Sequence, residues 1–303
     1  MEKQFFTAAI SSEIFKIISE ASKQLHIESY VIGGFVRDFF LKRGTAKDID
    51  IVAIGNGIAL AEKVASLLPN KPKVQIFKTY GTAMLRYKDV EIEFVGARKE
   101  SYSEESRNPL IFEGTLQEDQ NRRDFTINAL ALSLNEANFG ALLDPFNGME
   151  DLENGTIKTP LNPDITYSDD PLRMMRAIRF ATQLNFTIEK ASLAAIAKNS
   201  QRLEIITRER IVDELNKIMG AAKPSIGFLL LEQTNLLSQL LSELIDLKGV
   251  EEVEGQKHKD NFYHTLEVVD NISKNTSDIW LRWAALLHDI GKAPTKRFSK
   301  KVG

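Results

Sequence analysis

Two patterns of apolar and polar positions divide this chain. Up to about residue 160, short segments rich in valine and isoleucine predict β-strands. These segments read "SYVIGG", "DIDIVAI", "KVQIFKT", "TAMLRY" and "VEIEFVGA". Helical spacing predicts helices around them, near residues 5–25, 35–42, 57–68 and 122–132. The first half is therefore predicted to be an α/β domain, a mixed sheet with helices.

The strand signal disappears from about residue 169 onwards. The segment "LLDPFNGMEDLENGTI", full of Asn, Gly, Asp and Pro, marks a turn-rich exit from the first half. Beyond it, helical spacing returns in segments such as "DPLRMMRAIRFATQL", "TRERIVDELNKIMG" and "DIWLRWAALLHDIG". The rest of the chain is therefore predicted to be all-helical.

Composition narrows the class of protein only slightly. The 303 residues are 43% hydrophobic and carry 39 basic and 42 acidic side chains, a net charge of -3, so any surface for nucleic acid must be local. The absence of cysteine excludes disulfides and thiolate metal sites. The N-terminal segment contains acidic residues and is no signal peptide, and no apolar run approaches the ~20 residues of a membrane span. We expect a cytoplasmic protein with no membrane partner.

One stretch, "YVIGGFVRDFFLKRGTAKDIDIVAIG", concentrates residues suited to phosphate chemistry. Asp48 and Asp50 alternate along a predicted strand, so both carboxylates project from the same face. They repel each other unless a cation lies between them, and oxygen ligands with spare positions suit Mg²⁺. The Gly33–Gly34 turn frees backbone N–H groups at the start of a helix, an anion site that Arg37 could also reach.

A neighbouring strand offers further carboxylates. In "VEIEFV", Glu91 and Glu93 share one strand face, and either could complete a carboxylate cluster. Of the two, we select Glu93 as the candidate catalytic residue beside Asp48 and Asp50. An Asp-x-Asp motif by itself more often marks solvated aspartates on a surface strand. The glycines and the arginine at this spacing reverse that interpretation and favour a cradle for Mg²⁺ and a triphosphate.

This stretch resembles a motif of a known family. "GGFVRDFFL" followed by "KDIDIV" resembles the head of the class II nucleotidyltransferases, which comprise CCA-adding enzymes and bacterial poly(A) polymerases. Four more motifs of this family follow in chain order: "RRDFTINALAL", "DPFNGMEDLENGTI", "DDPLRMMRAIRFA" and "RERIVDEL". One departure is Asp169-Asp170, where the family's base-reading motif usually begins Glu-Asp.

The resemblance implies an architecture and an activity. It implies a head of the nucleotidyltransferase fold at residues 1–160, a helical neck for base recognition at 161–222 and a helical body with a partial HD-like segment at 223–303. The activity implied is template-independent addition of C and A to the 3′ end of tRNA, from CTP and ATP. Asp48 and Asp50 would hold Mg²⁺, with two ions expected.

The motif "NRRDFTINAL" supplies further candidates for binding the nucleotide. Arg122 and Arg123 are candidate phosphate clamps, and Asp124 or Asn128 could hydrogen-bond ribose hydroxyls. The alternative is that Asp124 caps a helix and that Asn128 is incidental.

The base-reading motif can be interpreted from its chemistry. Asp170 and Arg173 lie three residues apart, so on a helix they share a face. Asp170 presents only acceptors and Arg173 only donors, a pattern that fits the amino group and unprotonated ring nitrogen of cytosine or adenine. Guanine and uracil present the reverse pattern and would leave a buried charge facing its own kind. Arg176 and Arg179 continue the ridge and could reach phosphate or base, unless they form a solvated charged stripe.

A second metal site is possible near the end of the chain. His264, His288 and Asp289 resemble the HD superfamily of metal-dependent phosphohydrolases and could hold a second divalent metal. A complete site also needs a later aspartate, and the sequence has none after Asp289. We therefore expect a fragment that lacks the end of its HD-like body and its tail. The alternative is that these histidines are helix residues without metal.

Several functions stay open at this point. Poly(A) polymerases and A-only or CC-only adding enzymes are rivals within the family. The region "VQIFKTYGTAML" lacks the Gly-Arg-Arg-Phe-type strand typical of poly(A) polymerases, which favours CCA addition. An HD-type phosphohydrolase and a non-catalytic RNA-binding protein are rivals from other classes. The missing aspartate argues against the first, and the intact Asp-x-Asp against the second.

Overall fold

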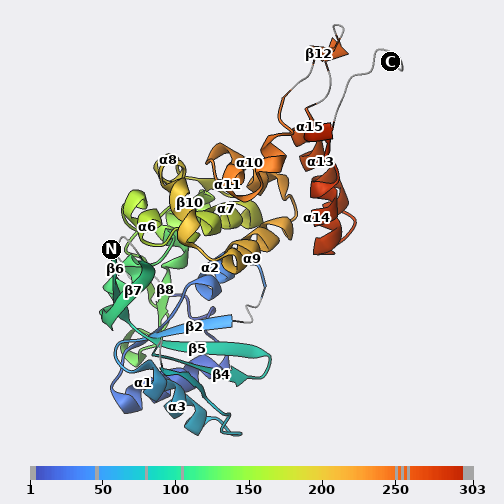
Figure 1. The fold of residues 1–303 in the computed structure, drawn as a ribbon. Coiled ribbons are helices and arrows are strands. Elements are labelled where there is room, and N and C mark those ends of the chain that lie inside the picture. Colours follow the sequence, from blue (N-terminus) through green and yellow to red (C-terminus); the bar gives the residue numbers. More distant parts are fainter. Residues whose placement is uncertain are drawn as a thin grey trace. The chain divides into compact units, whose positions relative to one another are not determined.

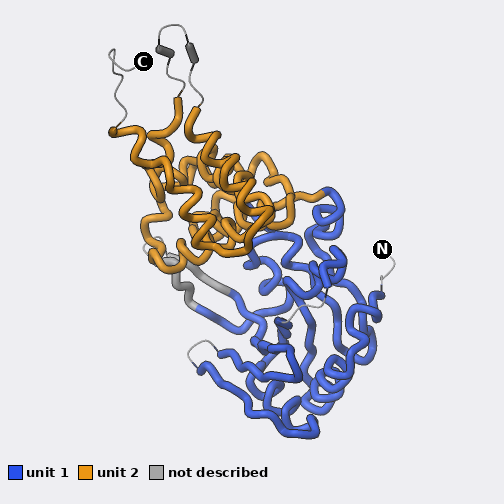
Figure 2. The backbone as a smooth tube through the Cα atoms, turned by 90° about the vertical axis from the view of Figure 1, so that its right-hand side faces the viewer, with its two compact units in different colours: residues 1–154, 158–162 blue, residues 155–157, 163–303 orange. Residues whose placement is uncertain are grey.

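The computed structural model (Figure 1) describes residues 5–44, 48–78, 81–103, 106–249, 252–253, 256–257 and 260–295. Figure 2 shows its two compact units, residues 1–154 with 158–162 and residues 155–157 with 163–303. The chain first passes from one unit to the other at residues 154–155, within the turn-rich segment, and passes for the last time at residues 162–163. The predicted division of the helical part into neck and body, at residue 222, falls inside the second unit and stays a prediction.

A seven-stranded sheet organises the first unit. Its strand order is β3-β4-β5-β2-β1-β8-β9. The strands are β1 Ser29–Ile32, β2 Asp48–Ala53, β3 Gln75–Phe77, β4 Thr82–Tyr87, β5 Val90–Gly96, β8 Ala131–Ser133 and β9 Leu142–Leu143. Within this sheet β2 and β5 pair in parallel, and the other neighbours pair antiparallel. The predicted mixed sheet is therefore present.

Alternation along β2 decides which side chains reach the core. Ile49 and Ile51 are buried, whereas Asp48 is exposed and Asp50 is partly exposed on the opposite face. Helices α1 (Glu13–Leu25) and α3 (Gly57–Leu67) pack against each other along one side of the sheet (Figure 1). An apolar cluster on the Asp50 side of the sheet supports the strand ends: Tyr30, Ile32, Val52, Ala97 and Ala131.

The expected helix over residues 122–132 is wrong. The helix in this region is α4, Leu116–Asn121, followed by a short 3₁₀ turn at Thr126–Asn128 and then by β8. Thr115 and Glu118 form a capping box that fixes the start of α4, because each side chain accepts from the other's backbone N–H. The remaining elements of the unit are α2 Gly34–Phe40, β6 Arg98–Ser103, β7 Ser106–Glu113, a 3₁₀ turn at Glu136–Asn138 and α5 Gly148–Glu153.

The second unit is mainly helical. Its helices are α6 Pro163–Asp169, α7 Leu172–Leu184, α8 Lys190–Asn199, α9 Arg208–Met219, α10 Ser225–Gln233, α11 Leu237–Leu240, α12 Ser242–Ile245, α13 Asn261–Ser273, α14 Ile279–Leu287 and α15 Lys292–Thr295, with a 3₁₀ turn at Ser200–Ile205. Two pairs of two-residue strands were not expected: β10 Thr156–Ile157 with β11 Thr187–Ile188, and β12 Glu252–Val253 with β13 Gln256–Lys257. They leave the helical character of the unit unchanged.

A buried arginine ties three helices of this unit together. Arg282 on α14 is 6% exposed, and its guanidinium donates only to backbone carbonyls in the hydrogen bonds described. Nη1 donates to Met219 and Ala221 at the end of α9, at 2.8 and 2.9 Å. Nε and Nη2 donate to Thr276 and Ser273 after and within α13. The fork of donors thus satisfies carbonyls at two helix ends.

Replacing Arg282 by methionine should destabilise the second unit strongly. The variant keeps the length of the side chain but leaves several buried carbonyls without a donor, a loss of about 3 kcal/mol or more in the free energy of unfolding. Urea denaturation followed by tryptophan fluorescence measures this change. Lys274→Met, at an exposed position after α13, is the control and should unfold like wild type. A loss below about 1 kcal/mol for Arg282→Met would contradict the clamp.

Candidate active site

The carboxylates of Asp48 and Asp50 project from one face of β2. In the parallel register Asp48 pairs with Glu91 and Asp50 with Glu93, so all four carboxylates belong to one face of the β2–β5 pair. Neighbouring strands lie roughly 4.8 Å apart, which brings Glu93 beside Asp50. The structure thus gathers the carboxylates that the sequence singled out; their catalytic role stays a prediction.

Gly33 lies against this group. It follows β1 and precedes α2 with a φ of +84°, a conformation that favours glycine. A Cβ placed on Gly33 would lie 3.4 Å from Oδ2 of Asp50 and 3.4 Å from Nη1 of Arg123. The bare backbone of Gly33 therefore borders both a carboxylate and a guanidinium. Gly34 begins α2 directly behind it.

Three predicted nucleotide-binding residues form one buried hydrogen-bonded chain. Arg37 on α2 donates from Nη1 to Oδ1 of Asn128 at 2.7 Å, and its Nε and Nη2 donate to the carboxylate of Asp38. The Asn128 amide in turn donates to Oδ1 of Asp124 at 3.0 Å, which also accepts from the N–H of Phe125. Asp124 does not cap a helix here, because the turn that follows begins at Thr126. Their roles toward a nucleotide stay predictions.

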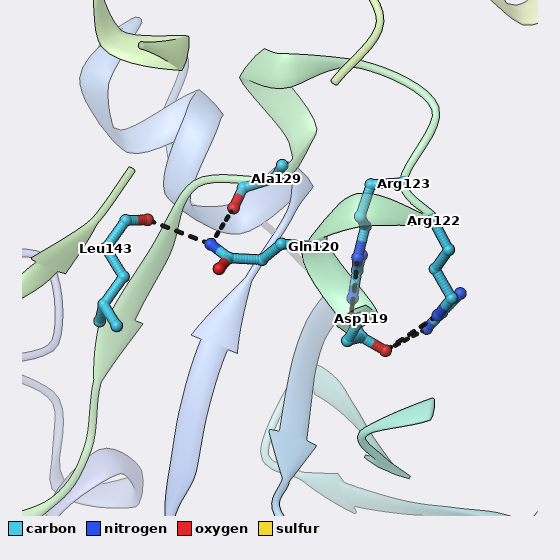
Figure 3. Close-up of polar contacts among 6 residues, drawn as sticks. All are labelled: Asp119, Gln120, Arg122, Arg123, Ala129 and Leu143. Carbon is cyan, nitrogen blue, oxygen red and sulfur yellow. Dashed lines mark hydrogen bonds and ion pairs between the residues drawn. The ribbon is translucent and has the colours of Figure 1, made fainter. Parts of the chain in front are cut away.

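Arg122 and Arg123 share a partner that sequence reasoning missed. Both donate to the carboxylate of Asp119 on α4, whose side chain is fully buried (Figure 3). Each of the two arginine side chains is 16% exposed, so one buried anion holds the two predicted phosphate clamps. The i, i+3 and i, i+4 spacing of these residues was the available signal.

The electrostatics separate the carboxylates into two kinds. The pKa of Asp50 is raised, chiefly because burial penalises its charged form; Arg123 opposes the shift and Asp48 adds to it. The pKa of Glu93 is also raised, chiefly by partial burial and then by the charge of Asp50. Burial acts the same way on Asp119, but Arg123 and Arg122 outweigh it and hold that pKa below its usual value.

This donor set fits Mg²⁺. Asp50 and Glu93 are carboxylates whose charged forms are disfavoured by their surroundings, and a cation would relieve that cost. Mg²⁺ is commonly held by one or two carboxylates together with substrate phosphates, which Asp48 and Asp50 match. Throughout the described part of the chain, no group of three or more His, Cys, Asp or Glu side chains could hold a metal by itself.

Asp50→Asn should not lower the stability of the metal-free protein at neutral pH. A carboxyl group whose pKa is raised by folding stabilises the fold while protonated, and this contribution is lost as pH rises through the folded pKa. The charged Asp50 therefore destabilises the fold above that pKa. Thermal unfolding in EDTA should give the variant an unfolding temperature equal to or above that of wild type. The difference should vanish below the unfolded pKa of about 3.9.

An exposed carboxylate serves as the control for this measurement. Asp89→Asn, in the turn between β4 and β5, should follow wild type at every pH. A clearly lower unfolding temperature for Asp50→Asn in EDTA would show that the charged form of Asp50 stabilises the fold, contrary to the electrostatics above.

In the second unit, Asp170 lies just before the helix that carries Arg173, whereas the sequence predicted both residues on that helix. Helix α7 begins at Leu172, and Asp170 lies between α6 and α7. Its backbone carbonyl accepts from the N–H of Arg173 at 3.0 Å, and its Oδ1 accepts from the N–H of Leu172 at 3.2 Å. Both side chains are partly exposed. The pair therefore stays in one helical turn, and base recognition by it stays a prediction.

Arg176 and Arg179 do not form a solvated stripe. Arg179 is 12% exposed and pairs with Glu214 on α9, with 2.6 Å between Nε and Oε2. Its guanidinium also lies 4.0 Å from the ring centre of Phe180, and Arg176 lies 5.5 Å from the same ring. Arg179 therefore joins the base-reading helix to the "RERIVDEL" helix. A role of either arginine toward phosphate or base stays a prediction.

Sequence profiles of known families match most of the chain. The profile of the poly A polymerase head domain matches residues 29–158, and that of the probable RNA and SrmB-binding site of polymerase A matches residues 185–247. The CCA-adding enzyme of Bacillus subtilis (strain 168) is 33% identical over 96% of this chain and 66% of its own length. The chain belongs to the nucleotidyltransferase family of CCA-adding enzymes and poly(A) polymerases.

The chain is also similar to relatives with other named specificities and to solved structures. The A-adding tRNA nucleotidyltransferase of Halalkalibacterium halodurans is 32% identical over 76% of this chain and 54% of its own length. A solved structure of the Thermotoga maritima CCA-adding enzyme complexed with tRNA-CCA matches with a TM-score of 0.73 and 25% identity, over 99% of this chain and 70% of that one. The chain thus spans less than two thirds of the length of the A-adding relative. The match to the solved structure confirms the predicted fold of an α/β head followed by helices.

The HD domain is the third family profile that matches, over residues 261–302. His264 lies on α13, and His288 and Asp289 follow α14. Nε2 of His288 lies 3.2 Å from Oδ2 of Asp289, and the same oxygen accepts from Lys292 at 2.6 Å. The HD-like segment is present; metal binding by its residues stays a prediction. Among the described residues, no helix is long and apolar enough to cross a membrane.

Proposed function

We propose that this nucleotidyltransferase adds C and A to the 3′ end of tRNA from CTP and ATP, with Mg²⁺. The observation that carries the proposal is the convergence of Asp48 and Asp50 of β2 with Gly33, which follows β1, and with Arg123. Carboxylates for a metal and a guanidinium for phosphate meet there beside bare backbone. We also propose the cytoplasm as its location, because tRNA and nucleoside triphosphates are available there.

The head residues have distinct tasks in this reaction. Asp48 and Asp50 would hold Mg²⁺, which when bound helps to activate the RNA 3′-hydroxyl and to neutralise the departing pyrophosphate. Arg123 gives Nε and Nη2 to Asp119, so Nη1 is the edge that lies beside Gly33 and Asp50. That edge is placed to donate to phosphate oxygens.

The choice of base belongs to the second unit in this proposal. Asp170 and Arg173 present an acceptor and a donor within one helical turn, the pattern that cytosine and adenine satisfy. The ion pair between Arg179 and Glu214 joins the helix that follows this turn, α7, to α9. Specificity then depends on positioned side chains rather than on a nucleic-acid template.

Relatives named for CCA addition and for A addition are 33% and 32% identical to this chain, so identity does not choose between these specificities. Addition of A only, or of CC only, is therefore the second candidate. Poly(A) synthesis is a third, since the matching head profile carries that name.

One set of assays separates these candidates. Transcripts of a tRNA ending before CCA, after C and after CC are incubated with Mg²⁺ and each labelled nucleoside triphosphate, and products are resolved at single-nucleotide length. We expect C on the first two transcripts and a single A on the third. An A-only enzyme extends the third transcript alone, a CC-only enzyme never adds A, and a poly(A) polymerase makes long tracts. No extension of any transcript would overturn the proposal.

A further inference from the structure

We propose that Asp119 is a positioning residue that holds Arg122 and Arg123 as a fixed pair for a polyphosphate. That this polyphosphate belongs to a nucleoside triphosphate rests on the proposed function. In the side-chain hydrogen bonds and ion pairs described, the Asp119 carboxylate contacts Arg122 and Arg123, and it acts through these two arginines.

Each oxygen of the Asp119 carboxylate takes one arginine. Oδ1 accepts from Nε of Arg122 at 3.0 Å and from its Nη2, and Oδ2 accepts from Nη2 and Nε of Arg123 at 3.2 and 3.3 Å (Figure 3). Two N–H groups of each guanidinium thus converge on one oxygen, which restricts both the position and the plane of that guanidinium. A single buried carboxylate thus sets the orientation of two cations at once.

The backbone that carries Asp119 is itself anchored. The next residue, Gln120, is 2% exposed, and its Nε2 donates to the carbonyls of Ala129 and Leu143 at 2.7 and 3.2 Å (Figure 3). These carbonyls belong to the segment before β8 and to β9. The end of α4 is therefore fastened to the sheet, and the carboxylate has little freedom to move with its arginines.

The charges show why this arrangement serves more than packing. Asp119 carries one negative charge against two guanidinium groups, so the three side chains together carry a formal charge of +1. Arg123 places this charge beside Gly33 and Oδ2 of Asp50. Without Asp119, the carboxylate of Asp50 would become the main partner of Arg123, because Nη1 of that arginine and Oδ2 of Asp50 border the same glycine, Gly33. Asp119 thus keeps Arg123 from closing on the oxygen that the proposed Mg²⁺ requires.

Binding of inorganic tripolyphosphate tests this inference without tRNA or base. Calorimetry measures its affinity, and that of CTP, for wild type, Asp119→Asn and Asp119→Glu. Asp119→Asn should weaken both affinities by on the order of tenfold, because Arg122 and Arg123 are then no longer held in the orientation that phosphate oxygens require. If the asparagine variant fails to fold, Asp119→Glu serves as the test in its place. It keeps the charge but moves it by one methylene, and its affinity for tripolyphosphate should be several-fold weaker than that of wild type. Asp89→Asn is the matched control and should bind as wild type does.

A double-mutant cycle separates positioning from a general effect on the fold. In an Arg122→Ala/Arg123→Ala background, Asp119→Asn should change tripolyphosphate affinity by less than about twofold, because its action passes through those side chains. An undiminished effect there, or wild-type affinity for a folded Asp119 variant, would overturn the inference. So would a wild-type protein that binds no tripolyphosphate. Tight tripolyphosphate binding by a protein that extends no tRNA would support the inference and reject the proposed function.

Discussion

Asp50→Ala and Asp48→Ala should each reduce nucleotide incorporation to background, a loss on the order of a thousandfold or more. Both carboxylates lie on the face of β2 beside Glu93, and neither is buried among apolar core side chains. Removing either takes away a proposed metal ligand while leaving Ile49 and Ile51 in the core. The initial rate of CTP incorporation into tRNA that lacks its CCA end, at saturating Mg²⁺, measures the loss.

The matched control is Glu62→Gln on α3, which removes an exposed carboxylate from a helix that packs along the sheet. Its rate should equal that of wild type. Circular dichroism confirms that the alanine variants remain folded. A rate within roughly tenfold of wild type for either aspartate variant would refute its assignment as a metal ligand.

Exchanging the charges of the base-reading pair should exchange the bases that are accepted. In the D170R/R173D variant, a donor faces the position where cytosine and adenine offer an amino group, and an acceptor faces their ring nitrogen. Uracil and guanine fit that reversed pattern. Mismatched hydrogen bonding of this kind costs several kcal/mol, so the preference should change by about a hundredfold or more. Rates with each of the four nucleoside triphosphates measure it.

A second charge exchange controls for the disturbance itself. Asp164 and Lys198 form an exposed ion pair of 2.8 Å in the same unit, with side chains 44% and 69% exposed. The D164K/K198D variant should keep the preference for CTP and ATP. If a folded D170R/R173D protein keeps that preference too, base recognition does not depend on this pair.

Period-two alternation was enough to predict the carboxylate face of β2, because strand geometry fixes which neighbours share a face. It could not show that β5 pairs with β2 in parallel and in the register that matches Asp50 with Glu93. That register depends on side chains distant in the sequence. Likewise, β11 comprises only two residues, too short for any periodic signal.

The region around α4 shows a different limit. The segment "RRDFTINALAL" has helical spacing, yet it forms a 3₁₀ turn and a strand because it completes the sheet beside β1. The true helix begins earlier, and its capping box at Thr115 and Glu118 was visible in the sequence. The spacing of Asp119 to Arg122 and Arg123 was also visible, but the sequence could not show that this one acidic residue of a polar helix is buried.

The parallel pairing of β2 with β5 also determines when the proposed metal site forms during folding. Parallel strands cannot be joined by a hairpin, and here α3, β3 and β4 lie between them in the sequence. Closing so long a loop is an entropic barrier, so this contact forms more slowly than the local β4–β5 hairpin. Until β2 and β5 pair, Asp50 and Glu93 are far apart and cannot bind a cation together. Cation binding at this face would therefore report completed assembly of the sheet, which local helix formation cannot imitate.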